Sequence, residues 1–568
     1  MPATTYKNRT TPGVYITELD AFPPSIVGVP TAVPAFIGYT EYAEINGKPV
    51  YNKAIRVGSM MDFENYFGGR FKPIYNLVSQ TNPRTNDNYD FSVKWEATSP
   101  PITPPVTSPP GDYFYYYLSP VTASEFYLYD SMRLFYANGG GNCYVVSVGS
   151  YEDGATISEK ALMGGLDVIR EQVGPTMLLI PDAVLLPPDT GGVNAEVDPL
   201  KPPYYKPYQK STKFQNVIRY MLKQCLDLQD RVAVMDVYST LSVIDKPSLD
   251  VAIEQFRVDV GSDPKTLSYG MAYFPFLHTS VVQLSDFDYT NLMSPTTLTQ
   301  ILTLENQRLY ADNPTRWRQT QDSINAMWNS VTNTWVTPTI TLPNRTTIDV
   351  TAMNQNLSAA IPLLAHIEQL LVEKKSILPP SGAMAGVYTF VDGARGVWNA
   401  PANVDLNAVD RTTYKLNDGQ QGELNMPIDG KAIDAIREFI GRGTVVWGAR
   451  TLDGNSNDWR YIQVRRTIIY IEQSIKAALA PFVFAPNTAT TWVTVTAMVS
   501  NFLSNLWAQG GLMGTKPTDA FTVNCGLGST MTGMDVLNGY MIVQVTLQMI
   551  HPAEFIELTF KQQMQGVG

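Results

Sequence analysis

Between residues 143 and 276, short apolar runs alternate with longer segments of helical periodicity. The runs have the length of strands and lie at 143–148, 177–182, 231–237 and 269–276. Helical patterns separate them at 158–171, 214–228 and 249–258. Strand–helix–strand alternation requires crossover connections, which are right-handed and produce a largely parallel sheet covered by helices. The sequence therefore predicts an α/β domain.

Three stretches interrupt this pattern and are predicted to be insertions on its outside. They lie near 81–112, 187–210 and 288–358. The first contains PPITPPVTSPP, which forces an extended backbone, and the second contains six more prolines. The third is rich in Thr and Asn and has weak periodicity, which is typical of a long surface excursion.

The C-terminal third is predicted to contain three helices. Their apolar positions are Ile433, Ile436 and Ile440, then Ile468, Ile471, Ile475 and Leu479, then Val495, Val499, Phe502 and Leu506. Gly510 and Gly511 follow the third helix, at the position where helices favour stopping. Lys516 is the only charged residue between 477 and 518, so this segment is expected to be packed on at least two sides.

Both ends of the chain show the alternation of β-strands. Val14 and Ile16 alternate with Tyr15 and Thr17, and residues 541–549 alternate before the break at 551–552. Alternation resumes over 554–560. A terminal strand must pair somewhere, because exposed ladder groups are a liability.

The charge content restricts the class of protein. Charged residues make up only 16% of the chain, against roughly 25% in ordinary soluble domains. Much of the surface is therefore expected to lie in contacts with other subunits. The formal net charge of -11 argues against a nucleic-acid binder, which needs cationic surface.

No metal, cofactor or export signal is expected. The three cysteines and three histidines are scattered, without the spacing of a metal site or a disulfide framework. The first residues lack the apolar run of a signal peptide, and no stretch approaches 18 apolar residues. The chain is expected to be made in the cytoplasm, with no direct membrane insertion.

The sequence contains no recognisable catalytic motif, so the chain is not expected to be an enzyme. GGLMGTKP (510–517) lacks the second glycine and the hydroxyl residue of a phosphate-binding loop. The chain contains no G-x-S-x-G, S-x-x-K or H-E-x-x-H. Asp182 and Asp236 end predicted strands, where α/β active sites gather, but such aspartates more often cap the following turn.

Several sequence blocks resemble contractile tail sheath proteins. TPGVYITE (11–18), IVGVPTAVPAFIG (26–38) and DFENYFGG (62–69) resemble the opening of that family. The C-terminal blocks resemble it more closely and follow in the family's order. They are LPPSGAMAGVYTFVDGARGVWNAPAN (378–403), QGELN (421–425), AIREFIGRGTVVWGARTL (435–452), WRYIQVRRT (459–467), FVFAPN (482–487) and HPAEFI (551–556). The undivided chain fits the branch of phage tails, R-type pyocins and extracellular contractile injection systems, rather than the two-chain sheath of type VI secretion.

The resemblance implies a helical sheath around an inner tube, which contracts to drive the tube through a target envelope. It implies an α/β and α+β multidomain fold in which a discontinuous core domain carries an outward α/β domain. The expected divisions are an N-terminal arm (1–25), the outer domain with its insertions (26–375), the core domain (376–535) and C-terminal arm strands (536–568). The expected partners are further copies of the chain, the inner tube protein, and baseplate and terminator or cap proteins.

The resemblance also implies that the terminal arms complete a neighbour's sheet. The residues expected to take part in this strand exchange are Val14, Tyr15, Ile16, Glu18, Phe555, Ile556, Leu558 and Phe560. The polar face of the last predicted helix and the loop after it are the predicted tube-facing surface. Its residues are Asn501, Ser504, Asn505, Gly510, Gly511 and Lys516.

An excess of positive charge between 431 and 476 has two interpretations. The basic residues could form ion pairs along helix faces, or they could form a positive surface for an acidic protein partner. The second interpretation makes Arg437, Arg442, Arg465 and Arg466 an alternative surface for the tube. The alternative function is a particle-decorating or receptor-binding surface protein without a contractile role, and an α/β hydrolase comes third.

Overall fold

A computed structural model describes residues 26–80, 89–94, 113–121, 125–152, 156–189, 208–329, 332–335 and 350–558. These residues form two compact units. Unit 1 comprises 26–29 and 470–551, and unit 2 comprises the other described residues, including 552–558. The boundary predicted at residue 376 does not coincide with this division, because strands between 404 and 446 belong to the main sheet of unit 2.

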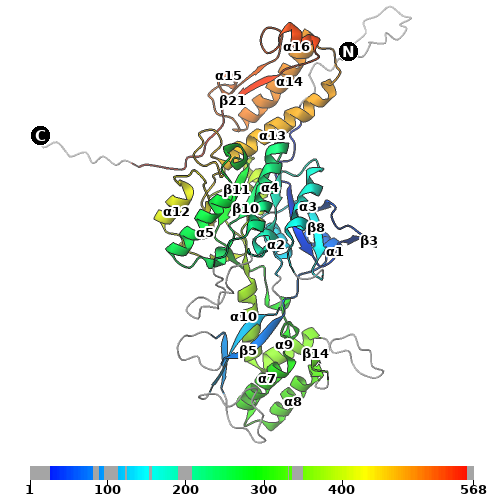
Figure 1. The fold of residues 1–568 in the computed structure, drawn as a ribbon, viewed down its shortest axis with the longest axis vertical. Helices are drawn as coiled ribbons and strands as arrows, with labels where there is room; N and C mark the ends of the chain where they lie inside the picture. The colour runs from blue at the N-terminus through cyan, green and yellow to red at the C-terminus, as the bar shows by residue number, and fades with distance from the viewer. Residues whose placement is uncertain are drawn as a thin grey trace, which may run out of the picture. The chain divides into compact units, whose positions relative to one another are not determined.

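A nine-stranded sheet forms the centre of unit 2, in the order β16-β19-β18-β11-β10-β9-β1-β8-β4 (Figure 1). Neighbouring strands from β8 to β18 in this order are parallel. At the two edges, β4 pairs with β8, β19 with β18, and β16 with β19, each in antiparallel orientation. Their bounds are Pro34–Thr40 (β1), Ile55–Val57 (β4), Cys143–Ser150 (β8), Met177–Leu179 (β9), Val232–Asp236 (β10), Gly270–Phe274 (β11), Val404–Asp405 (β16), Asp434–Phe439 (β18) and Gly443–Val446 (β19). The predicted parallel sheet is confirmed.

Helices cover this sheet in pairs. The pair α2 and α11 packs together on the sheet, and so does the pair α3 and α4. Their bounds, with that of the neighbouring α5, are Leu128–Ala137 (α2), Glu159–Arg170 (α3), Thr212–Leu228 (α4), Lys246–Asp259 (α5) and Ser381–Arg395 (α11). Ser158 and Ser211 cap α3 and α4 by accepting backbone N–H bonds. Gly386 lets α11 approach α2 closely, because a Cβ there would lie 2.6 Å from the carbonyl oxygen of Phe135.

Residues 288–358 are helical over most of their described length, so the prediction of a surface excursion was wrong there. They contain α7 (Pro295–Tyr310), α8 (Pro314–Ala326) and α9 (Val350–Ala360), and α10 (Pro362–Lys375) follows. Thr, Asn and Gln surround the apolar positions and weaken the helical periodicity. Prolines at the first positions of α7, α8 and α10 were the available start signals.

An antiparallel sheet accompanies these helices, and together they are named here the helical lobe (Figure 1). The sheet has the order β5-β7-β6, with bounds Tyr75–Gln80, Tyr113–Pro120 and Phe91–Lys94. Strand β6 comes from the first predicted insertion. Phe91 and Val93 on it are buried, so this part of the insertion belongs to the core of the lobe.

Shorter elements complete unit 2. They are β2 (Glu44–Ile45), β3 (Lys48–Pro49), α1 (Met60–Phe67), α6 (Pro264–Leu267), β12 (Leu277–Thr279), β13 (Trp328–Asn329), β14 (Thr334–Trp335), β15 (Ile377–Leu378), β17 (Val409–Thr412) and α12 (Asp418–Asn425). Strands β15, β12 and β17 form a three-stranded sheet.

The segment around Ile436 is strand β18, and the helix predicted there was wrong. Isoleucines spaced three and four apart fit a helix, but Gly441 and Gly443 have positive φ and form the turn into β19. The Gly-Arg-Gly sequence followed by β-branched residues was the signal for a hairpin.

Unit 1 contains the end of α13 and the whole of α14. The bounds are Ile462–Leu479 (α13), Ala489–Ala508 (α14), Pro517–Ala520 (α15), Phe521–Asn524 (β20), Gly533–Leu537 (α16) and Gln544–Leu547 (β21). The first eight residues of α13 belong to unit 2 and the remainder to unit 1. Helices α13 and α14 confirm two of the three helices predicted in this region.

Candidate assembly surfaces

Helix α14 separates an apolar stripe from a polar face. Val495, Met498, Val499, Phe502, Leu503 and Leu506 are buried. The predicted tube-facing residues Asn501 and Asn505 are exposed, and Ser504 is half-buried. The helix thus brings these three polar side chains to one accessible face.

The loop after α14 carries the other predicted tube-facing residues. Gly510 is exposed with φ +81°, a conformation that favours glycine. Gly511 is buried, because its backbone packs against Leu506, whose Cδ1 lies 2.6 Å from the position of an added Cβ. Lys516 is exposed at the start of α15. The accessible part of this candidate surface is therefore smaller than predicted.

The nearly uncharged segment 477–518 leaves apolar side chains uncovered, contrary to the expected packing on two sides. Val483, Val493 and Met513 are more than half exposed, and Phe484 is fully exposed. Leu537 and Tyr540, further along unit 1, are exposed as well. These exposed apolar side chains are available for contacts with other chains.

Within the described residues, strands β20 and β21 form a two-stranded antiparallel sheet whose outer edges pair with no third strand. Phe521 pairs with Leu547 and Asn524 with Gln544. A two-stranded sheet is marginal by itself and leaves unpaired backbone groups along both outer edges. It can therefore accept further strands.

The C-terminal residues predicted to exchange strands are exposed as far as they are described. Phe555, Ile556 and Leu558 have exposed fractions of 71%, 79% and 74%. Residues 552–558 form no strand within the described chain. Phe560 and the N-terminal residues Val14, Tyr15, Ile16 and Glu18 lie outside the described residues.

The alternative basic surface is wrong for two of its four residues. Arg465 is buried, with its guanidinium 3.5 Å from the Trp459 ring centroid, and it donates to Ser268 Oγ. Arg466 is buried in a bidentate ion pair with Asp392, at 2.7 and 2.8 Å. Neither side chain can face a partner.

The other two basic residues form ion pairs nearer the surface. Arg437 donates to Asp418 at 2.8 Å, and Arg442 donates to Asp405 at 2.7 Å. Three of the four arginines therefore form ion pairs, but these pairs join separate elements and do not run along one helix face as expected. Arg465 stacks on Trp459.

Asp182 and Asp236 serve as backbone caps. Asp182 accepts from the backbone N–H groups of Tyr39, Tyr127 and Leu128 at 2.6–3.2 Å. Asp236 accepts from the N–H and Oγ of Ser381, at the start of α11. Burial raises the pKa of Asp182 to about 6 and that of Asp236 to about 7.

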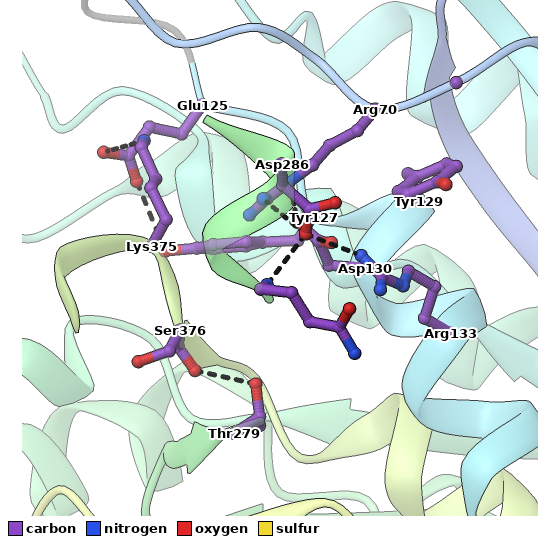
Figure 2. Close-up of polar contacts among 12 residues, drawn as sticks. Arg70, Glu125, Tyr127, Tyr129, Asp130, Arg133, Thr279, Asp286, Lys375 and Ser376 are labelled. Carbon is purple, nitrogen blue, oxygen red and sulfur yellow. Dashed lines mark hydrogen bonds and ion pairs between the residues drawn. The ribbon is translucent and has the colours of Figure 1, made fainter. Parts of the chain in front are cut away.

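A charged cluster lies at the junction of the helical lobe with the rest of unit 2, and Lys375 at the end of α10 is the residue that the lobe contributes (Figure 2). Asp286 Oδ2 accepts from Arg133 at 3.0 Å and from Arg70 at 3.4 Å, and Arg70 Nε also donates to Asp130 at 3.0 Å. Nearby, Lys375 pairs with Glu125 at 3.0 Å. Acids and bases alternate in this network, so it neutralises itself and holds the junction together.

The described residues contain neither a metal-binding cluster nor a helix that could span a membrane. No group of three His, Cys, Asp or Glu side chains in them could hold a metal ion. None of the helices described is long and apolar enough to cross a membrane. The described residues present exposed apolar side chains, open strand edges and an exposed terminal segment. A structural subunit that associates with other chains has these features.

Comparisons with known proteins identify the class of subunit. Residues 455–563 match the family model of the phage tail sheath C-terminal domain. No curated protein matches the chain. Among solved structures, the chain is 26% identical to the helical sheath of the anti-feeding prophage (AFP) in the contracted state, with a TM-score of 0.53, covering 98% of this chain and 100% of that one.

Two further structures give similar values. The contracted sheath complex of PVC, an extracellular contractile injection system, is 25% identical, with a TM-score of 0.52 and coverage of 98% and 99%. A chain of the AFP baseplate is 25% identical, with a TM-score of 0.52 and coverage of 98% and 100%. Residues 455–563 thus match the phage tail sheath C-terminal domain, and nearly the whole chain is similar to contractile sheath proteins. The chain is a structural subunit of a phage-tail-like contractile particle.

Proposed function

We propose that the chain is made in the cytoplasm, polymerises helically around an inner tube, and contracts to drive that tube through a target envelope. The observation that carries the proposal is similarity over nearly the full chain to sheaths in the contracted state. Baseplate association is consistent with the similarity to an AFP baseplate chain. Terminator or cap proteins would close the other end.

The contraction would be a rigid-body rearrangement between two packings of the same subunit. Head-to-tail, heterologous contacts generate open helices, as a sheath requires. Units with rigid cores and exposed contact surfaces suit such a change, because packed cores do not deform continuously. A switching free energy of only a few kcal/mol per subunit would sum over the many copies of a sheath.

Strand exchange between copies would hold the lattice together. The exposed residues 556–558 alternate apolar and polar side chains, and the β20–β21 sheet offers open edges within the described chain. We propose that this sheet in one copy accepts terminal strands from other copies. Backbone pairing would supply the affinity, and the alternating side chains would supply the specificity.

The polar face of α14, together with Lys516, is the proposed tube contact. Small polar groups and one flexible lysine suit a weak interface, and a weak interface is needed because contraction must strip each subunit from the tube. The exposed positions Asn501, Asn505 and Lys516 are available for such a contact.

Co-expression with a small tube-forming protein tests the proposed function. Negative-stain electron microscopy should show striated cylinders that enclose a tube, and contraction should leave shorter, wider cylinders. A particle-decorating or receptor-binding protein would remain particulate under the same conditions. That result would contradict the proposal.

A further inference from the structure

One carboxylate holds the C-terminal segment to unit 2. Glu554 receives Arg450 Nε at 2.9 Å and Arg450 Nη2 at 2.5 Å. It also receives Tyr461 Oη at 3.1 Å and Asn425 Nδ2 at 2.6 Å. Four donors fill the capacity of a carboxylate, so this side chain is fully engaged. Its side chain is 21% exposed, whereas the next four residues are exposed.

The partner arginine is also held by contacts that do not involve Glu554. The backbone N–H of Arg450 donates to Asp434 at 2.8 Å, and its Nη1 donates to the carbonyl oxygen of Gly454 at 3.1 Å. Its side chain is only 2% exposed. Detaching Glu554 would leave a buried guanidinium without its counter-charge, which is strongly unfavourable.

The donors come from three separate segments of unit 2. Asn425 is the last residue of α12, Arg450 follows β19, and Tyr461 directly precedes α13. Glu554 therefore joins three parts of the fold at the point where the chain has returned from unit 1 to unit 2. The apolar side chains Phe555, Ile556 and Leu558 begin immediately after it.

We infer that Glu554 is a positioning residue: by binding Arg450, Tyr461 and Asn425 it fixes the root of the C-terminal arm and so sets the register in which a neighbouring copy receives that arm. This inference rests on the proposed exchange of arms. Side chains alternate between the two faces of a strand, so a slip of one residue would exchange the faces of Ile556 and Leu558 with those of Phe555 and Glu557. A fixed root prevents that slip.

The test compares Glu554→Gln with Glu171→Gln in the full-length chain. Both variants remove one negative charge, but Glu171 is exposed at the end of α3, outside the arm. A spin label on Leu558→Cys reports arm mobility in dilute, unassembled protein. Cys525→Ser is included because Cys143 and Cys225 are buried and Cys525 is not. Negative-stain counting of cylinders at equal protein concentration reports assembly.

The expected result is that Glu554→Gln mobilises the label and lowers the number of cylinders at least tenfold, while Glu171→Gln behaves as the unmodified chain. The near-ultraviolet circular dichroism of both should be unchanged. Loss of that signal in Glu554→Gln would overturn the inference, because Glu554 would then hold the fold rather than the arm.

Removal of residues 555–568 separates the inference from the proposed function. If the truncated chain forms no cylinders while Glu554→Gln forms them normally, the exchange of arms stands and the positioning role of Glu554 is overturned. If the truncated chain forms normal cylinders, the proposed exchange fails, and the inference about Glu554 fails with it.

Discussion

Asp392 and Arg466 form an ion pair within unit 2, and both side chains are almost fully buried. The guanidinium of Arg466 also lies over the ring of Tyr388, at 4.5 Å from its centroid. A buried pair of this kind depends on both partners, because either charge left alone would be desolvated without compensation.

We predict that Asp392→Asn lowers the free energy of unfolding by about 3–5 kcal/mol, the range for breaking a buried pair. Denaturant unfolding followed by fluorescence measures the change. Asp405→Asn is the matched control, because its partner Arg442 is 42% exposed and surface pairs contribute about 0–1 kcal/mol. Equal effects of the two changes would contradict the buried pair's importance.

The raised pKa of Asp236 should make the free energy of unfolding depend on pH. Burial raises its pKa to about 7, so the folded protein keeps a proton that the unfolded chain releases near pH 4. Its contribution to stability is complete below about pH 4 and is lost as the pH rises to about 7. Asp182 acts in the same direction, up to about pH 6.

We therefore predict that Asp236→Asn flattens the fall in unfolding free energy between pH 6 and 7, where Asp182 has largely titrated. Denaturant unfolding at a series of pH values checks the slope. Asp312→Asn is the control, since Asp312 is exposed. An unchanged slope in Asp236→Asn would show that this carboxyl does not titrate in the window.

At the scale of elements, the terminal arms are the parts proposed to connect copies. A proline cannot donate a ladder hydrogen bond, so it blocks strand addition while leaving an exposed segment otherwise unaffected. Leu558 is exposed, and it makes no contribution to the core of unit 2.

We predict that Leu558→Pro gives a folded, soluble protein that forms no polymers, while Leu558→Ala still polymerises because its N–H remains. Ile16→Pro and deletion of residues 1–20 should have the same effect as Leu558→Pro. Analytical ultracentrifugation and negative-stain microscopy give the measurement. Normal cylinders from Leu558→Pro would rule out pairing through this part of the backbone.

A second prediction at this scale concerns which residues of the insertions can be replaced without loss of assembly. The fold reduces the replaceable ranges. Replacing 83–110 would remove β6 with its buried Phe91 and Val93, so the replaceable segment of the first insertion is 95–112. In the second insertion, Tyr208 packs partly against the core, and the replaceable segment is 191–206.

A short Gly/Ser linker at 95–112 or 191–206 should leave extended and contracted sheaths possible, since changes in loop length cost only about 0.6 kcal/mol per doubling. Thermal unfolding and microscopy check this. A linker across 83–110 is the comparison, and it should destabilise the helical lobe. Failure of the shorter replacements to assemble, with the fold intact, would assign these segments to an interface.

At the scale of the whole molecule, unit 1 carries the proposed tube contact. We predict that Lys516→Glu combined with Asn505→Glu lowers the yield of extended, tube-filled sheath and favours empty contracted sheath. The reason is that two new negative charges would weaken an interface that is already weak. Counting filled and empty cylinders in micrographs gives the measurement.

Normal numbers of tube-filled particles from this double variant would contradict the prediction and show that the tube-facing surface lies elsewhere. Arg465 and Arg466 are excluded as that surface by burial. Arg437 and Arg442 remain, although each already has an acidic partner. Lys476→Glu, on an exposed position of α13, is the control for reversing a lysine charge elsewhere in the chain, and the single variant Lys516→Glu is its partner of equal charge change.

Local sequence determined the parallel sheet, most of its helices and the apolar stripe of α14. Strands such as β10 are buried on both faces and therefore read as continuous apolar runs. The stripe of α14 follows from the 3.6-residue period alone. Serine caps at 158 and 211 act within one turn, so they too can be recognised in the sequence.

Only the tertiary structure decided what depends on distant partners. Ile436 entered a strand because β11 and β19 flank it, which short isoleucine spacing cannot reveal. Arg466 is buried against Asp392, which is 74 residues away in the chain, whereas Arg442 pairs with Asp405 nearer the surface. Glu554 meets Arg450 across 104 residues. Periodicity describes a neighbourhood along the chain, whereas burial and ion pairing are set by the neighbourhood in space.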